Sequence, residues 1–249
     1  MNDRTSHMRL LGSLTMLLLF VAIVACIPAF ASETETRDDT FSVGAAPKIV
    51  VSNDNGQINV VTGNEGTVNV RAIIRRPDDV EYGVVQEGDT IRVEARVSSG
   101  WGWGFGTDAG AEITVTLPAD ANVDLRTSNG GIGVVDIQNS GKLWTSNGRI
   151  SLENVKGEFE VSTSNGDIDF RGEMTAGGMN RLTTSNGRVE VTLLGEPSVR
   201  LDATTSNGAI TSKLPIVATE SGVNRLVGVV GGGDAVLVIK TSNGSITVQ

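Results

Sequence analysis

Apolar and polar residues alternate along most of the chain after residue 41, and the alternation is centred on a repeated Thr-Ser-Asn-Gly tetrapeptide. Apolar residues stand two positions before each Thr and two positions after each Gly, with mostly polar or small residues between them. Alternation on both sides of a fixed Asn-Gly predicts a strand, a tight corner and a second strand. The six copies begin at Thr127, Thr145, Thr163, Thr184, Thr205 and Thr241.

The copies are spaced by 18, 18, 21, 21 and 36 residues, and repeats of this period indicate a solenoid. We therefore predict an all-β fold, a parallel β-solenoid (β-helix-like) whose coils repeat every 18–21 residues. A hairpin meander is the competing arrangement, but it gives no reason for the same tetrapeptide at each corner. In a solenoid, equivalent residues stack about 4.8 Å apart, so Thr, Ser and Asn side chains can hydrogen-bond between coils. Asn-Gly also tolerates positive φ, which we expect at the corners. The corner residues are Asn129, Gly130, Asn147, Gly148, Asn165, Gly166, Asn186, Gly187, Asn207, Gly208, Asn243 and Gly244.

The first part of the β-rich region, residues 41–118, alternates in the same way but lacks the perfect tetrapeptide that recurs in residues 119–249. Asn55-Gly56 stands at the centre of a degenerate seventh copy. Its predicted inward residues are Val51, Ile58 and Val60. Residues 41–118 are either early coils of the same solenoid or a capping β-layer, and the pattern leaves both open.

The first 31 residues have the pattern of a targeting segment. They carry no charge from Leu10 to Ala31, and Ala29-Phe30-Ala31 fits a signal-peptidase site that leaves Ser32 as the first mature residue. Two alternatives stay open: lipidation of Cys26 within a lipobox-like run, and an uncleaved segment long enough to span a bilayer. All three predict an exported protein that is extracellular, on the cell surface or periplasmic. Residues 32–40 are polar and acidic and are predicted to be a linker to the domain at 41–249.

Charge and composition narrow the classes of function. The chain has 20 basic and 29 acidic side chains, a net charge of −9, which argues against a nucleic-acid partner. His7 and Cys26 are its one histidine and one cysteine, and both lie in the targeting segment. The rest of the chain therefore lacks the residues for a Cys/His zinc site, a disulfide or a Ser-His-Asp triad. We predict no enzyme activity, no cofactor and no metal site.

The repeated Thr-Ser-Asn-Gly-x-Ile, the Leu117-Pro118-Ala119 segment before the first copy and the glycines at 231–233 before the last are together distinctive. On these residues the chain, over residues 41–249, resembles the bacterial putative-adhesin family of exported domains of unknown function. That family is similar to the head domains of autotransporter adhesins. The resemblance implies a β-helix-like fold on an exported protein, and it brings no catalytic motif.

The candidate ligand-binding residues are aromatic. Trp101, Trp103 and Phe105 alternate with glycines in a chain that is 4% aromatic, which predicts a loop projecting between two strands. Exposed rings on such a loop suit contact with a sugar, a partner or a membrane interface. Alternatively, the rings fold back and cover the core of the solenoid. Trp144 faces outward by alternation and would extend the same patch.

Stacking also aligns charged residues on the outside of the solenoid. Arg149, Asp167 and Arg188 are predicted to form a ladder of alternating charge, which stabilises neighbouring strands. Asp169 and Glu190 would be adjacent carboxylates, the arrangement used in glycoside hydrolysis. These two residues define the alternative of a carbohydrate-active enzyme, although the two arginines are placed to compensate their charge.

The sequence favours a non-enzymatic envelope or surface protein, an adhesin-like binding module for a glycan or an envelope protein. The chain ends at Gln249 within a predicted strand, so an unpaired edge there would allow association with a second copy or a partner. That edge defines a further alternative, a structural or regulatory envelope module that acts by edge-to-edge association. The insertion at 214–234 could instead fold over that end. Membrane association is expected only through the N-terminal segment.

Overall fold

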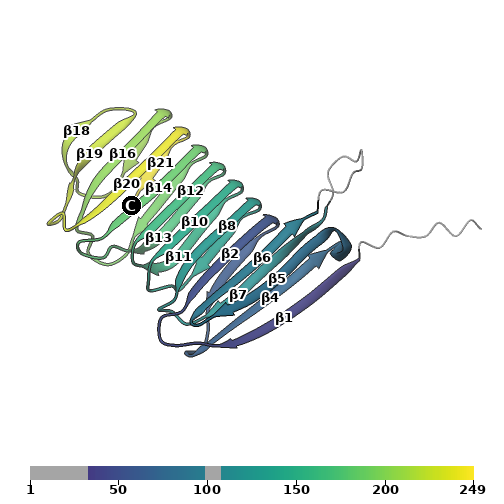
Figure 1. The fold of residues 1–249 in the computed structure, drawn as a ribbon. Coiled ribbons are helices and arrows are strands. Elements are labelled where there is room, and N and C mark those ends of the chain that lie inside the picture. Colours follow the sequence, from purple (N-terminus) through teal and green to yellow (C-terminus); the bar gives the residue numbers. More distant parts are fainter. Residues whose placement is uncertain (1–32, 99–107) are drawn as a thin grey trace, which may run out of the picture. The chain divides into compact units, whose positions relative to one another are not determined.

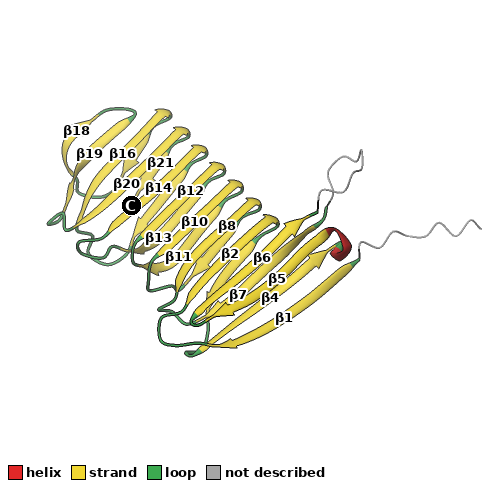
Figure 2. Cartoon of the chain, viewed as in Figure 1, coloured by secondary structure: helices red, strands yellow, loops and turns green. Residues whose placement is uncertain are grey.

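A computed structural model, described for residues 33–98 and 108–249, shows two long β-sheets stacked face to face (Figure 1). Strands dominate this region, and its helical element is one 3-10 turn at Pro77–Asp79 (Figure 2). These described residues form one compact unit. The predictions for residues 1–31, including the signal peptide and lipidation of Cys26, lie outside the described residues. Among residues 33–98 and 108–249, no helix has the length and apolar character needed to cross a membrane.

We name the two sheets sheet I and sheet II. In spatial order, sheet I consists of β18 (Val217–Ser221), β19 (Arg225–Val230), β16 (Val199–Asn207), β20 (Ala235–Asn243), β14 (Met179–Asn186), β12 (Phe159–Asn165), β10 (Gly141–Asn147), β8 (Asn122–Asn129), β2 (Lys48–Asn55), β6 (Thr90–Val97) and β5 (Val80–Glu87). Sheet II consists of β1 (Thr34–Ser42), β4 (Thr67–Arg75), β7 (Gly110–Leu117), β3 (Ile58–Thr62), β9 (Ile132–Val135), β11 (Ile150–Lys156), β13 (Ile168–Glu173), β15 (Val189–Leu193), β21 (Ile246–Val248) and β17 (Ile210–Ser212).

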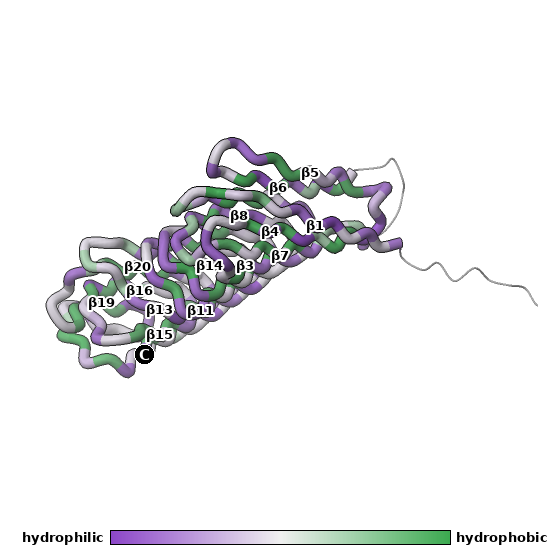
Figure 3. Tube along the Cα trace, turned by 90° about the horizontal axis from the view of Figure 1, so that it is seen from below, coloured by the Kyte–Doolittle hydropathy of each residue, from purple (hydrophilic) through white to green (hydrophobic). Residues whose placement is uncertain are grey.

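Each regular coil is a strand of sheet I, an Asn-Gly corner and the next strand of sheet II. Neighbouring coils are parallel and in register, so that Thr145 lies opposite both Thr127 and Thr163. Alternate residues point inward, and Figure 3 shows hydrophobic and hydrophilic positions alternating along the strands. Apolar residues of both sheets form one continuous core, in which Leu143 and Ile150 are at most 1% exposed. The predicted parallel β-solenoid is confirmed.

Residues 41–118 supply both early coils and a cap. The coil β2–β3 stacks directly on β8–β9, and Val51, Ile58 and Val60 are fully buried in it. The coil β6–β7 stacks on its other side. Beyond that coil, β4 pairs antiparallel with β7, and β5 pairs antiparallel with β6. Residues 41–118 are therefore early coils of the solenoid in one part and a capping β-layer in another.

The prediction of a polar linker at residues 32–40 is wrong, because Thr34–Ser42 form strand β1. It pairs antiparallel with β4 along its whole length and is the outermost strand of sheet II. Its Arg37 and Asp39 lie opposite the buried Ala72 and Val70, so charged residues occupy the face that apolar residues occupy elsewhere. A polar strand suits the end of a repeat array, since it stops further stacking.

Coils at the C-terminal end do not stack in the order of the sequence, which corrects the prediction of a free edge at the C-terminus. The last coil, β20–β21, lies between β14–β15 and β16–β17. Strand β21 is paired on both sides, and the C-terminus lies inside the stack (Figure 1). The insertion between the fifth and last copies forms β18 and β19, which continue sheet I beyond β16. The insertion therefore covers the end of the stack at the fifth copy, and not the strand that ends the chain.

The corner glycines are required for a different reason than the one predicted. None of the six glycines of the perfect tetrapeptide has positive φ. Instead, each lies against the carbonyl group of the equivalent glycine in the next coil: a Cβ on Gly166 would meet the Gly148 carbonyl oxygen far inside van der Waals contact. Glycine is thus demanded by close approach of two backbones, and the expectation of positive φ is wrong.

Candidate functional site

The corner between the two sheets is filled by a ladder of buried threonines. The first residue of every tetrapeptide is at most 5% exposed, and its Oγ1 donates a hydrogen bond to a glycine carbonyl of the neighbouring coil at 2.9–3.1 Å. The donors are Thr127, Thr145, Thr163, Thr184, Thr205 and Thr241. In the degenerate coil Asn53 takes this place and donates to the Ala111 carbonyl at 2.8 Å.

A second ladder, of asparagines, runs outside the first. The Nδ2 of each asparagine after the first donates to the Oδ1 of the asparagine in the preceding coil of the stack at 2.8–3.0 Å. The donors are Asn147, Asn165, Asn186, Asn243 and Asn207. The structure therefore places all the predicted Asn-Gly pairs at one corner, where their polar groups are used in stacking.

The outer face of sheet I carries Trp144, which is 41% exposed on β10. Arg126 of β8 and Ser162 of β12 lie directly opposite it in the two neighbouring strands. Two residues earlier on the same strand, Lys142 lies between Asp124 and Glu160. Lys142 Nζ is 3.5 Å from Glu160 Oε2, and Arg126 Nε is 3.3 Å from Asp124 Oδ1. An exposed indole is thus surrounded by hydrogen-bonding side chains.

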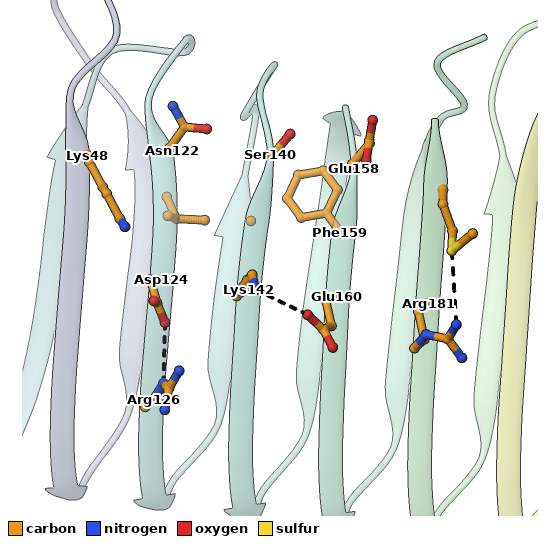
Figure 4. Close-up of a pocket in the computed structure, with 13 residues that line it drawn as sticks. Lys48, Asn122, Asp124, Arg126, Ser140, Lys142, Glu158, Phe159, Glu160 and Arg181 are labelled. Carbon is orange, nitrogen blue, oxygen red and sulfur yellow. Dashed lines mark hydrogen bonds and ion pairs between the residues drawn. The ribbon is translucent and has the colours of Figure 1, made fainter. Parts of the chain in front are cut away.

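The same face is hollowed next to Trp144. A depression of about 640 Å³ extends over β2, β8, β10, β12 and β14, and its lining includes Lys142 of the middle strand, β10, and Ser140, the residue before that strand (Figure 4). A smaller depression of about 330 Å³ contains Trp144 itself. The alternation of apolar and polar residues does not predict this hollow.

The predicted residues Trp101, Trp103 and Phe105 lie outside the described residues. Strand β6, which precedes them, ends at Val97, and strand β7, which follows them, begins at Gly110. Two strands, β2 and β8, separate β6 from β10 in sheet I, which at about 4.8 Å per strand is about 14 Å. Among the described aromatic residues, Trp144 is the exposed one.

The outer face of sheet II brings together the charged residues that the sequence aligned. Asp167 lies between Arg149 and Arg188, at 3.3 Å and 3.4 Å from their guanidinium nitrogens. Asp169 and Glu190 lie directly opposite each other on β13 and β15. Arg149 Nε is 3.3 Å from Asp169 Oδ2, and Glu190 accepts a hydrogen bond from Gln249. Both carboxylates thus have partners.

The two aspartates have opposite pKa shifts. The backbone N–H of Arg188 donates to Asp167 at 2.8 Å and, with the neighbouring guanidinium groups, lowers the pKa of that carboxyl. Burial raises the pKa of Asp169 above its ordinary value of 3.8, and the nearby Arg149 only partly offsets it. The folded state therefore favours the charged form of Asp167 and disfavours the charged form of Asp169.

Asparagine substitutions at these two positions are expected to act differently near neutral pH. A lowered pKa means that Asp167 stabilises the fold above its unfolded pKa and loses this contribution as the pH falls through the folded pKa. Asp167→Asn should therefore cost about 0.5–1 kcal/mol near neutral pH and little in acid. Asp169→Asn should be neutral or stabilising, because it removes a charge that burial opposes. Urea unfolding at both pH values checks this, and equal losses near neutral pH would contradict it.

Comparison with known proteins gives a family for the repeats. The family model described as Toastrack DUF4097 matches residues 121–249, more than half of the chain. The chain is similar to a solved structure described as a putative cell adhesion protein from Clostridium sporogenes, with 14% identity, a TM-score of 0.49, and coverage of 86% of this chain and 99% of that one. It is also similar to a putative adhesin from Bacteroides fragilis (12% identity, TM-score 0.31, coverage 88% and 98%). A third is a putative lipid binding protein from Parabacteroides distasonis (13% identity, TM-score 0.29, coverage 88% and 98%).

No curated protein matches the chain. The three structures are too distant for their names to say what this chain binds. The family match, in contrast, spans all six Thr-Ser-Asn-Gly copies, together with the threonine and asparagine ladders that they build. By this match the chain belongs to the Toastrack DUF4097 family.

Proposed function

We propose that this chain is a non-enzymatic binding module of the cell envelope or cell surface, of the adhesin type. The observation that carries the proposal is Trp144, an indole 41% exposed on the outer face of a rigid parallel sheet. A large aromatic side chain left on such a surface, beside charged and hydroxyl groups, is suited to contact with a ligand. The N-terminal segment, which is uncharged from Leu10 to Ala31, and the family resemblance support export.

The contact surface in this proposal includes Trp144 and the aromatic segment Trp101, Trp103 and Phe105. The test is retention of the purified full chain on a glycan array and on intact bacterial cells. Trp144→Ala, and the double variant Trp101→Ala with Trp103→Ala, should each lower retention at least about fivefold, because aromatic anchors dominate binding surfaces.

Val85→Ala is the matched control, since Val85 is 55% exposed on β5 and lies on another part of sheet I. It should leave retention unchanged. If the double tryptophan variant unfolds, the aromatic segment covers the core, and contact is left to Trp144. If the wild-type chain is retained on no glycan and no cell, the proposed function is wrong.

One observation favours a carbohydrate-active enzyme as a second candidate. Asp169 and Glu190 face each other in a depression of about 210 Å³ on sheet II, and the pKa of Asp169 is raised. A carboxyl with a raised pKa beside a second carboxylate is the pair that glycoside hydrolysis uses. Asp169→Asn and Glu190→Gln should abolish any glycan cleavage that the wild-type chain shows, and unchanged cleavage would exclude this pair.

A third candidate is association through a sheet edge, at β18 and not at the C-terminal strand that the sequence predicted. All five residues of β18 are exposed, and β18 is the outermost strand of sheet I. Its pairing with β19 is interrupted by a register shift between Ala218 and Glu220. Irregular edges resist pairing with a further strand, so this candidate is weaker than the first. A monomeric mass at high protein concentration would remove it.

A further inference from the structure

The two depressions on sheet I form one hollow, because both are lined by Asp124, Arg126, Lys142 and Glu160. The hollow crosses the strands from β2 to β14, which are five adjacent strands of the sheet. At about 4.8 Å per strand, it extends over about 19 Å. This length accommodates several units of a linear polymer. The long axis of the hollow runs across the strands and not along them.

Beneath the hollow, the core leaves no room for a side chain at position 141, which faces inward. A Cβ on Gly141 would lie within 3.0 Å of Val123 Cγ2 and of the Phe159 ring. Phe159 is 1% exposed, and its backbone N–H donates to the buried Asn180 Oδ1 at 2.8 Å, which fixes its position. Core packing therefore fixes the position of the strands beneath the hollow, whose lining includes Phe159 (Figure 4).

Charges around the hollow are close to balanced. Its lining has four basic and three acidic side chains, and two ion pairs, Arg126–Asp124 and Lys142–Glu160, lie at its centre. The side chains in these pairs are 23% to 68% exposed, so each has hydrogen-bonding capacity left for a ligand. A balanced field gives little attraction to an anionic or cationic polymer, whereas exposed donors and acceptors suit hydroxyl groups.

Trp144 adds an apolar platform at one side of these pairs. The indole is 41% exposed, and Arg126 is directly opposite it on β8. A pyranose ring has an apolar face of C–H groups and an edge of hydroxyl groups. Its face can cover an indole while its edge reaches neighbouring charged groups, which is the combination that this surface presents.

We propose that the hollow across β2, β8, β10, β12 and β14 binds an uncharged linear oligosaccharide, with one sugar ring stacked on Trp144 and its hydroxyl groups bonded to Asp124, Arg126, Lys142 and Glu160. This inference rests on the proposed binding function and names its ligand class and its site. It assigns the recognition to sheet I, on the face opposite to the carboxylate pair Asp169 and Glu190.

The experiment is calorimetric titration of the full chain with chitohexaose, cellohexaose and maltohexaose as uncharged probes, and with heparin and polygalacturonate as anionic probes. At least one uncharged probe should bind, with a Kd that changes less than about twofold when the salt concentration is raised, since there is no charge to screen. Trp144→Ala should weaken binding at least about tenfold, and Glu160→Gln about threefold.

Glu65→Gln is the matched control, because Glu65 is exposed in the turn between β3 and β4 and lines none of the depressions described above, so the same substitution there should not change the Kd. Thermal unfolding of each variant shows that the fold is kept. Binding that Trp144→Ala and Glu160→Gln leave unchanged would overturn this inference and keep the proposed function. So would binding of the anionic probes alone, with strong salt dependence. Absence of binding to every glycan and cell in the retention assay overturns the proposed function itself.

Discussion

Gly166→Ala is expected to destabilise the solenoid by about 3 kcal/mol or more, because a single methyl group has no room at the corner. The added Cβ would overlap the Gly148 carbonyl group, and it would also crowd the Arg149 nitrogen. Neither backbone can move away freely. The Gly148 carbonyl accepts a hydrogen bond from Thr163, and the Gly166 N–H donates to the Asn186 carbonyl at 3.0 Å.

Gly83→Ala is the matched control for this result. Gly83 lies in β5, lacks positive φ, and a Cβ there would meet no atom within 4 Å. Alanine has less backbone freedom to lose than glycine, so this variant should be within about 0.5 kcal/mol of the wild type or slightly more stable. Urea unfolding followed by circular dichroism measures both variants. If the two have the same stability, the close approach of the corner backbones is not a constraint on this fold.

The coils themselves could be predicted because the sequence repeats the same inward and outward pattern at each copy. A strand whose register slips by one residue would turn Leu143 or Ile150 to solvent, so the alternation fixes which face is buried. The identical Thr-Ser-Asn-Gly corners then fix the alignment of one coil on the next. Because the corners are identical, they do not show in which order the coils stack.

The order at the C-terminal end follows from how apolar each copy is. The inward residues of β21 are Ile246 and Val248, both fully buried, whereas those of β17 are Ile210 and Ser212, both half-buried. A serine in the inward column costs less at the end of the array than in its middle. Ser212 was therefore a readable signal that the fifth copy, and not the sixth, is the terminal coil.

The parts that escaped prediction lack an alternating apolar signal. Strand β1 has acidic and basic residues on its inward face, because it closes the end of the array and covers little core. The hollow on sheet I is lined mainly by outward residues of five adjacent strands, from β2 to β14. Such a combination is visible in the sequence only after the coils have been aligned. The position of Trp144 needed only alternation, and it was predicted correctly as outward.

Thr184→Val is expected to cost about 2 kcal/mol, because it removes one hydrogen bond of the buried threonine ladder without changing side-chain volume. Thr184 is 2% exposed, and its Oγ1 donates to the Gly166 carbonyl oxygen at 2.9 Å. Valine keeps the shape and the preference for strands but leaves that carbonyl oxygen without this donor in a buried corner.

Thr183→Val, at the preceding residue of the same strand, separates this effect from the general consequence of replacing threonine. Thr183 is half-buried on the outer face of β14 and, among the residues that the structure describes, has no side-chain hydrogen bond. The variant should therefore stay within about 0.5 kcal/mol of the wild type. Equal losses at positions 183 and 184 would show that the ladder contributes nothing beyond side-chain packing. A loss confined to position 184 would mean that the tetrapeptide begins with Thr because its hydroxyl joins one coil to the next, as its asparagine and glycine do at the same corner.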